Sequence, residues 1–266
     1  MSSDEGTVMI LATFAAGIVW AIWLWQVAFT ARRCSRFAHR WPLTVYPGAA
    51  FALLYGILKR FSSLDVREDP VYLAFYMILG AAWVGAVAWL LPYLGLSARD
   101  DVIERANPAV AQAIGGALLG LTLGYAGANI GNGPGWWVVV FSAFLATAAL
   151  LLLWVFLDKA TGLADTLTID RDLAAGLRAL GFFAGTGLIL GRAVAGDWTS
   201  AADTAADFAR TGWPALLLWA VAVFLEKQLR PSAEQPQPPV VTHGLAPLLL
   251  YLGIAAFSLR WMGWWS

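Results

Sequence analysis

Arg178 is the residue of this sequence best placed to do chemistry, because it lies about two helical turns inside a long apolar run, 173–195. A charged side chain within a membrane segment is costly, and such residues mark ion or substrate pathways. Two structural roles remain open beside that functional one. The guanidinium either snorkels to the nearby interface or pairs with Asp158 or Glu104 from a neighbouring hairpin.

A second candidate site is the polar turn just before the apolar run 108–130. Asn107 is followed by Pro108, and an asparagine before a proline is a strong helix-start signal, so we expect Asn107 to cap a helix. Asp101, Glu104 and Arg105 stand just before it. Their acidic excess favours a cation or a partner over an anion at this helix start, although a solvated loop explains the same residues.

The turn before Arg178 has the same acidic character, since Asp165, Asp170 and Asp172 accompany Arg171. Metal and enzyme motifs are lacking. Cys34 is the only cysteine, and His39 and His243 are too few and too distant to suggest a His/Cys metal site. The sequence contains no nucleophile set, P-loop or dinucleotide fingerprint. We therefore expect no enzyme activity and no cofactor.

The elements that must position these residues are membrane helices. Hydrophobic residues make up 60% of the 266-residue chain and charged residues only 13%, and the mean hydropathy is +0.68. Soluble domains carry about one-quarter charged residues, so the expected surroundings are a lipid bilayer. The formal net charge of zero gives no basic surface for nucleic acid.

About 20 apolar residues cross the hydrocarbon core as a helix, and this length predicts an all-α polytopic bundle of about eight spans. The second and seventh expected spans are short. Residues 197–212 are expected to form an interfacial helix. The spans are expected near 7–30, 43–58, 71–96, 108–130, 136–157, 173–195, 213–226 and 244–262.

The basic residues predict the orientation of the chain. With the N-terminus outside, the external loops hold only Lys59, Arg60, Arg67 and Arg210, and the remaining loop cations fall inside, which follows the positive-inside rule. We expect both termini outside the cytoplasm. The expected internal cations are Arg32, Arg33, Arg36, Arg40, Arg99, Arg105, Lys159, Arg171, Lys227 and Arg230. Tryptophans expected at the outer ends of spans are Trp136, Trp137, Trp198, Trp213, Trp261, Trp264 and Trp265.

An offset of 65 residues aligns Asn107 with Asp172 and also aligns glycines in the runs that follow. Two consecutive hairpins thus match in the same orientation, which predicts tandem parallel helical-hairpin repeats. We divide the chain into an N-terminal hairpin at 1–70, a central repeated four-helix unit at 71–196, and an interfacial segment with a C-terminal hairpin at 197–266.

Glycines at four-residue spacing mark faces where helices approach closely in lipid. We expect them to pack the fourth and sixth spans against each other at the centre of the bundle. The glycines of these faces are Gly116, Gly120 and Gly124 in the first run, and Gly181 and Gly185, then Gly187 and Gly191, in the second.

The stretch Asp101-Val-Ile-Glu-Arg-Ala-Asn107-Pro-Ala-Val-Ala111, followed by Gly116 and Gly120, resembles the YjfL-like family of bacterial inner-membrane proteins of unknown function. The resemblance covers about 80–195. It implies a four-helix unit with a weaker second copy, in which Asp172, Ala174, Gly176 and Gly181 take the matching positions. The second copy lacks the asparagine, and the resemblance implies no activity.

Two functions remain in view. Small-residue packing, lipid-facing aromatic residues and the lack of motifs favour a structural or interaction subunit of a membrane complex, with partner subunits or further copies of itself. Internal repetition, glycine-lined central helices and Arg178 favour the alternative, a small-solute or ion transporter or channel whose path lies in the central repeat.

Overall fold

The computed structural model describes the whole chain except residues 1, 31–39, 233, 236–237 and 264–266. The described part is helical, with no strand. Its α-helices are α1 (Ser3–Trp25), α3 (Pro42–Phe61), α4 (Leu64–Glu68), α5 (Pro70–Ala88), α6 (Pro108–Gly127), α7 (Trp136–Thr161), α8 (Leu163–Thr168), α9 (Leu173–Ala193), α10 (Ala201–Gly212), α11 (Pro214–Leu229) and α12 (Ala246–Trp261). Shorter turns of other helix types are η1 (Gln26–Thr30), η3 (Leu91–Leu94), η4 (Ala98–Glu104) and η5 (Val241–Leu245).

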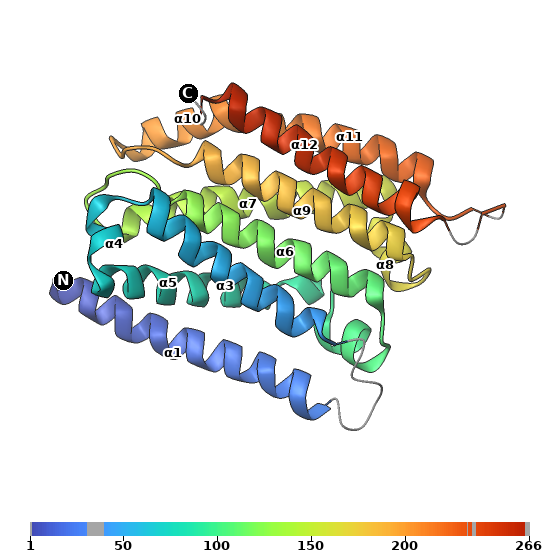
Figure 1. Cartoon of the computed structure of the whole chain (residues 1–266), viewed down its shortest axis with the longest axis horizontal. Coiled ribbons are helices and arrows are strands. Elements are labelled where there is room, and N and C mark those ends of the chain that lie inside the picture. The colour runs from blue at the N-terminus through green and yellow to red at the C-terminus, as the bar shows by residue number, and fades with distance from the viewer. Residues whose placement is uncertain (1, 31–39, 233, 236–237, 264–266) are drawn as a thin grey trace.

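Six helices of the described chain are long and apolar enough to cross a membrane. α10 and α11 meet the same criteria only together and are bent by 41°, so the pair raises the number to seven if it is one span. α3 does not meet them, although it runs beside the long helices in Figure 1. The chain is therefore a multi-pass helical protein with about six spans. The six spans are Ser3–Phe29, Pro70–Ala88, Pro108–Gly127, Trp136–Thr161, Leu173–Ala193 and Val241–Trp261.

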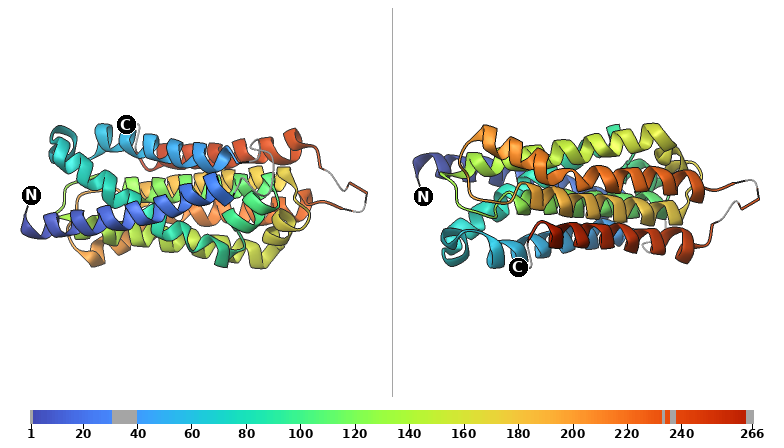
Figure 2. Two further views of the ribbon diagram at one scale, coloured as in Figure 1. Left: turned by 90° about the horizontal axis from the view of Figure 1, so that it is seen from below. Right: turned by 90° about the horizontal axis from the view of Figure 1, so that it is seen from above.

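The long helices run roughly parallel to one another along the molecule (Figures 1 and 2). α1 lies at one edge, and α11 and α12 lie at the opposite edge. α6 and α9 form the centre, since 83% and 78% of their apolar windows are buried, against 17% for α1. α1 begins and α12 ends at the same end of the bundle.

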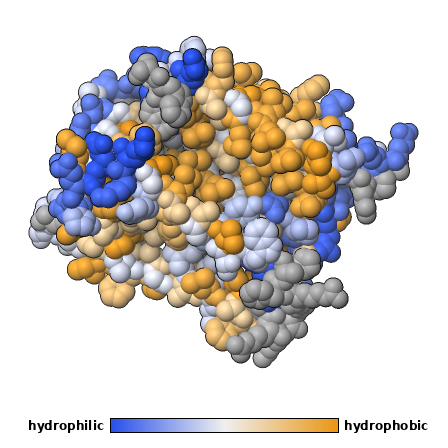
Figure 3. Space-filling view, viewed as in Figure 1, coloured by the Kyte–Doolittle hydropathy of each residue, from blue (hydrophilic) through white to orange (hydrophobic). Residues whose placement is uncertain are grey.

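The surface has the polarity of a membrane protein. Figure 3 shows hydrophobic residues over the middle of one face and hydrophilic residues gathered at its two ends. Large aromatic residues are exposed at both ends: Trp137, Trp213 and Trp261 at one, and Trp25, Trp41, Trp89 and Tyr93 at the other. Amphipathic rings favour headgroup depth, so two aromatic belts frame the apolar middle. Trp264 and Trp265, and the cations Arg32, Arg33 and Arg36, lie outside the described residues.

Local sequence explains where the central helices begin. Asn107 accepts hydrogen bonds from the backbone N–H groups of Ala109 and Val110, and Asp172 accepts them from Ala174 and Ala175. These side chains satisfy backbone donors that a helix start would otherwise leave without partners. The prediction that Asn107 is a helix cap is confirmed.

Glycines allow the backbones of α6 and α9 to touch. A Cβ atom on Gly120 would overlap the carbonyl of Phe183, and one on Gly187 would overlap the backbone of Gly120. Gly116 meets the backbone of Leu180 in the same way, and Gly176 meets that of Ala109. The expected central packing of these two spans is therefore present.

The facing of two other glycines was predicted wrongly. Gly181 packs on Leu248 of α12, and Gly185 meets Tyr251 of α12 and Leu218 of α11. Gly124 does lie at the α6–α9 contact, because a Cβ on Gly191 of α9 would be 3.5 Å from its backbone nitrogen. Because each residue turns a helix by about 100°, Gly181 lies about 120° around α9 from Gly187. α9 thus has two glycine faces, and only one of them contacts α6.

This packing predicts different outcomes for two single-methyl changes. Gly187→Ala should lower stability by about 1–3 kcal/mol because its Cβ has no space against Gly120. Gly253→Ala in α12 is the matched control, since nothing lies within 4 Å of a Cβ there, and it should be neutral or stabilising by up to about 1 kcal/mol. Thermal unfolding in detergent measures both. Equal unfolding midpoints for the two variants would show that α6 and α9 do not touch at Gly187.

Candidate functional site

The candidate site is a buried ion pair between α9 and α11. Arg178 is fully buried, and Glu226 is 3% exposed. Arg178 Nε donates to Glu226 Oε1 and Arg178 Nη2 donates to Glu226 Oε2, each at 2.8 Å, while Nη1 donates to the carbonyl oxygen of His243 in η5 at 2.7 Å. The parallel pair of hydrogen bonds is the strongest geometry between arginine and a carboxylate.

Asp172 is the second carboxylate of the cluster. Its Oδ2 lies 3.8 Å from Arg178 Nη2, while both its oxygens accept hydrogen bonds from the first turn of α9. One cation therefore faces two carboxylates, and the positive end of the α9 dipole lies beside Asp172. The structure brings together Arg178 and Asp172, two of the residues proposed from sequence.

Two expectations about Arg178 were wrong. Its head does not snorkel to an aqueous surface, and its partner is neither Asp158 nor Glu104. Asp158 accepts from the backbone N–H of Ala164, and Glu104 pairs with Arg99 at 3.2 Å.

Sequence reasoning missed Glu226 because it stands at the polar end of its apolar run. The positions 215, 218, 222 and 226 follow helical spacing, and all four are buried on one face of α11. An acidic residue in phase with an apolar stripe is the signal that identifies a buried carboxylate.

The polar turn before α6 is a structural unit of its own. Asp101 is 5% exposed; its Oδ1 lies 3.2 Å from Arg105 Nη1, and its Oδ2 accepts from the backbone N–H of Ser97. Asn107 is fully buried, and its Nδ2 donates to the carbonyl of Leu167 at 2.8 Å. The side chains of Asp101, Arg105 and Asn107 thus have partners within the chain, and Asn107 joins this turn to the one before α9.

The two turns share their backbone geometry at an offset of 65 residues. Ala106 and Arg171, at equivalent positions, both adopt left-handed conformations with φ of 53° and 56°. The backbone N–H of Asn107 donates to the carbonyl of Asp101 at 2.9 Å, and that of Asp172 donates to the carbonyl of Thr166 at 3.3 Å. Arg171 also donates to the carbonyl of Arg105, so the two acidic turns lie side by side.

The chemistry open to this arrangement is limited. Within the described ranges, no group of three or more His, Cys, Asp or Glu side chains is placed to hold a metal ion. Arg178 has three donors engaged and no exposed surface. Two buried hydroxyls in the described chain, Thr186 and Tyr251, have no hydrogen-bond partner. The ion pair is therefore suited to holding α9, α11 and the start of α12 together.

In comparisons with known proteins, no family model, curated protein or solved structure matches the chain. The resemblance to the YjfL-like family stays a prediction.

The ion pair predicts a non-additive pair of substitutions. Arg178→Met should cost about 3–5 kcal/mol of stability, because it leaves the Glu226 carboxylate buried and unpaired. Adding Glu226→Met should restore most of that loss, since two apolar side chains leave no charge to desolvate. Thermal unfolding of both variants in the same detergent measures the difference.

The control is Arg210→Met, which breaks the exposed pair with Asp207 at 3.3 Å and should leave the unfolding midpoint unchanged. A double variant no more stable than Arg178→Met would contradict the pairing.

Proposed function

We propose that the chain is an integral membrane interaction subunit, a rigid helical body that holds partner subunits or further copies of itself within a bacterial inner membrane. The observation that carries the proposal is the backbone contact between α6 and α9. With the carbonyl of Phe183 against Gly120 and the backbone of Gly120 against Gly187, no solute fits between the two central helices. A closed centre suits a scaffold and argues against a path along this seam.

The ion pair supports the same proposal. A transport site needs a charged group whose partner changes during the cycle, whereas each of the three guanidinium nitrogens of Arg178 already donates to Glu226 or to the His243 carbonyl. Breaking this arrangement would leave both charges unpaired in a low-dielectric interior. The pair therefore favours one fixed arrangement of α9, α11 and α12.

α1 is the face most open to a partner. It contacts the bundle mainly along α5, and Ile10, Leu11, Phe14 and Ile18 are all more than half exposed. In a membrane such a surface is covered by lipid or by another helix that packs against it. We propose that this side of the bundle meets partner subunits.

The transporter alternative keeps one specific observation in its favour. Thr186 of α9 and Tyr251 of α12 carry buried hydroxyls without hydrogen-bond partners among the described residues. Buried polar groups of this kind cost about 1–3 kcal/mol each unless water or a ligand satisfies them. In this alternative the path lies within the central repeat at 71–196, apart from the closed seam between α6 and α9.

We further propose eight spans built from tandem hairpin repeats. The shared left-handed residues Ala106 and Arg171 and the shared caps Asn107 and Asp172 support the central repeat. α3 and α11 would then be the second and seventh spans. An even number of spans agrees with α1 beginning and α12 ending at one end of the bundle.

Gentle extraction of the tagged protein from native membranes, followed by mass spectrometry, tests the subunit proposal. We expect partner proteins, or further copies of the chain, at fixed stoichiometry. The matched control is the untagged protein from the same cells, which defines the background. Recovery of a monomer without partners would overturn the proposal and make solute flux in liposomes the next assay.

Single-cysteine labelling tests the proposed orientation. In a Cys34→Ser background, Thr199→Cys and Ser232→Cys place thiols in exposed loops, the first between α9 and α10 and the second between α11 and α12. A membrane-impermeant maleimide should label position 199 in intact spheroplasts and position 232 only after permeabilisation. Labelling of position 232 in intact spheroplasts and of position 199 only after permeabilisation would show the opposite orientation.

A further inference from the structure

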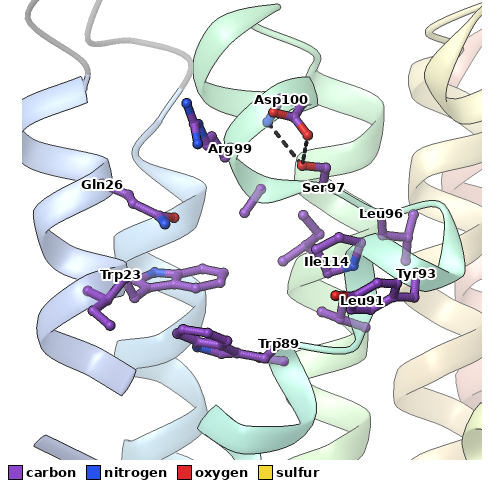
Figure 4. Close-up of a pocket in the computed structure, with 14 residues that line it drawn as sticks. Trp23, Gln26, Trp89, Leu91, Tyr93, Leu96, Ser97, Arg99, Asp100 and Ile114 are labelled. Carbon is purple, nitrogen blue, oxygen red and sulfur yellow. Dashed lines mark hydrogen bonds between the residues drawn. The ribbon is translucent and has the colours of Figure 1, made fainter. Parts of the chain in front are cut away.

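A pocket of about 310 Å³ lies where α1 ends, away from the ion pair. Its walls come from α1, from the end of α5 with η3 and η4, and from α6 (Figure 4). The volume is at the lower end of the roughly 300–1,000 Å³ usual for small-molecule sites. The pocket exists because the α-helix ends at Ala88 and the chain turns through the short helices η3 and η4 before α6 begins.

One side of the pocket is aromatic and apolar. Trp23, Leu91, Leu96 and Ile114 line it and are buried. The indole N–H of Trp23 donates to the carbonyl of Leu43 at 2.9 Å, which fixes the ring against the cavity. In Figure 4 the Trp23 and Trp89 side chains extend from their helices into the space between α1 and the opposite wall.

The other side carries one positive and one negative side chain. Arg99 uses its Nε for Glu104, and its two terminal nitrogens have no hydrogen-bond partner among the described residues. Asp100 accepts from the Ser97 hydroxyl through one carboxylate oxygen, which leaves the other available. Gln26, the first residue of η1, has a side-chain amide without a hydrogen bond to any described residue, and it points toward this side (Figure 4).

Exposed aromatic residues place the pocket at headgroup depth. Trp89 and Tyr93 line it and are 50% and 87% exposed, and they directly follow the last turn of the apolar helix α5. Tryptophan and tyrosine gather where hydrocarbon meets headgroups. A ligand with its polar head beside Arg99 and Asp100 would therefore have its apolar part beside α1 and α5.

We propose that this pocket binds the headgroup of a zwitterionic phospholipid with a primary amine. The phosphate is held by the Arg99 guanidinium and the Gln26 amide, and the ammonium donates to the Asp100 carboxylate. A purely anionic headgroup has no ammonium group to donate to the Asp100 carboxylate, and Glu104 is already paired with Arg99. A choline headgroup cannot donate hydrogen bonds to Asp100, because its nitrogen carries no hydrogen.

Native mass spectrometry of the full-length protein tests this assignment. The protein is titrated with phosphatidylethanolamine, phosphatidylcholine or phosphatidylglycerol of the same acyl chains. We expect one phosphatidylethanolamine to be retained with about a five- to tenfold preference over the other two, as one solvent-exposed hydrogen bond of ordinary net strength allows. Equal retention of the three lipids would overturn the proposal.

Two variants separate the roles of the charges. Arg99→Gln should weaken retention of both phosphatidylethanolamine and phosphatidylcholine, because both present a phosphate. Asp100→Asn should remove the preference for phosphatidylethanolamine over phosphatidylcholine while leaving phosphatidylcholine unchanged. The matched controls are Arg210→Gln and Asp207→Asn, which disrupt an exposed pair of similar length in α10. Variants that behave like these controls would sink the assignment.

Free phosphoethanolamine distinguishes a lipid from a soluble ligand with the same head. At millimolar concentration it should leave the bound lipid in place, because it lacks the acyl chains that contact α1 and α5. Displacement of the lipid would assign the pocket to a soluble phosphate-and-amine compound and overturn the lipid proposal.

Discussion

The backbone contact between α6 and α9 is the constraint on which the rest of the structure depends. Lipid gives helices no hydrophobic reason to associate, so van der Waals contact and polar bonds must hold them together. Gly120 and Gly187 supply that contact by removing the side chains that would separate the two backbones. The other helices pack around this closed seam, which is why the proposed role is that of a rigid body and not of a conduit.

The ion pair fixes the second layer of the bundle. α9 uses one glycine face for α6 and another, at Gly181 and Gly185, for α12 and α11. Arg178 and Glu226 lie in that second interface and satisfy each other in a bidentate pair. A buried pair of this kind contributes little net stability, but it penalises any register in which one charge is left alone. The ion pair therefore holds α11 and the start of α12 in one position against α9.

The sequence was informative wherever one residue type carries a local rule. Apolar runs located the long helices, and Asn107 before Pro108 located the start of α6. It was uninformative wherever the answer depends on which helix lies opposite. Glu226 is 48 residues from Arg178, and the partner of a buried charge follows from the fold. The helix that Gly181 contacts and the pocket beside Trp23 likewise depend on contacts between segments distant in sequence, so no local sequence pattern predicts them.

Amide hydrogen exchange in lipid nanodiscs tests the closed centre most directly, because exchange along a helix reports whether water reaches its backbone. The account predicts that α6 and α9 exchange more slowly than α1, which is the least buried of the six candidate spans. Faster exchange along facing sides of α6 and α9 than along α1 would reveal a water-filled path between the central helices and contradict the account.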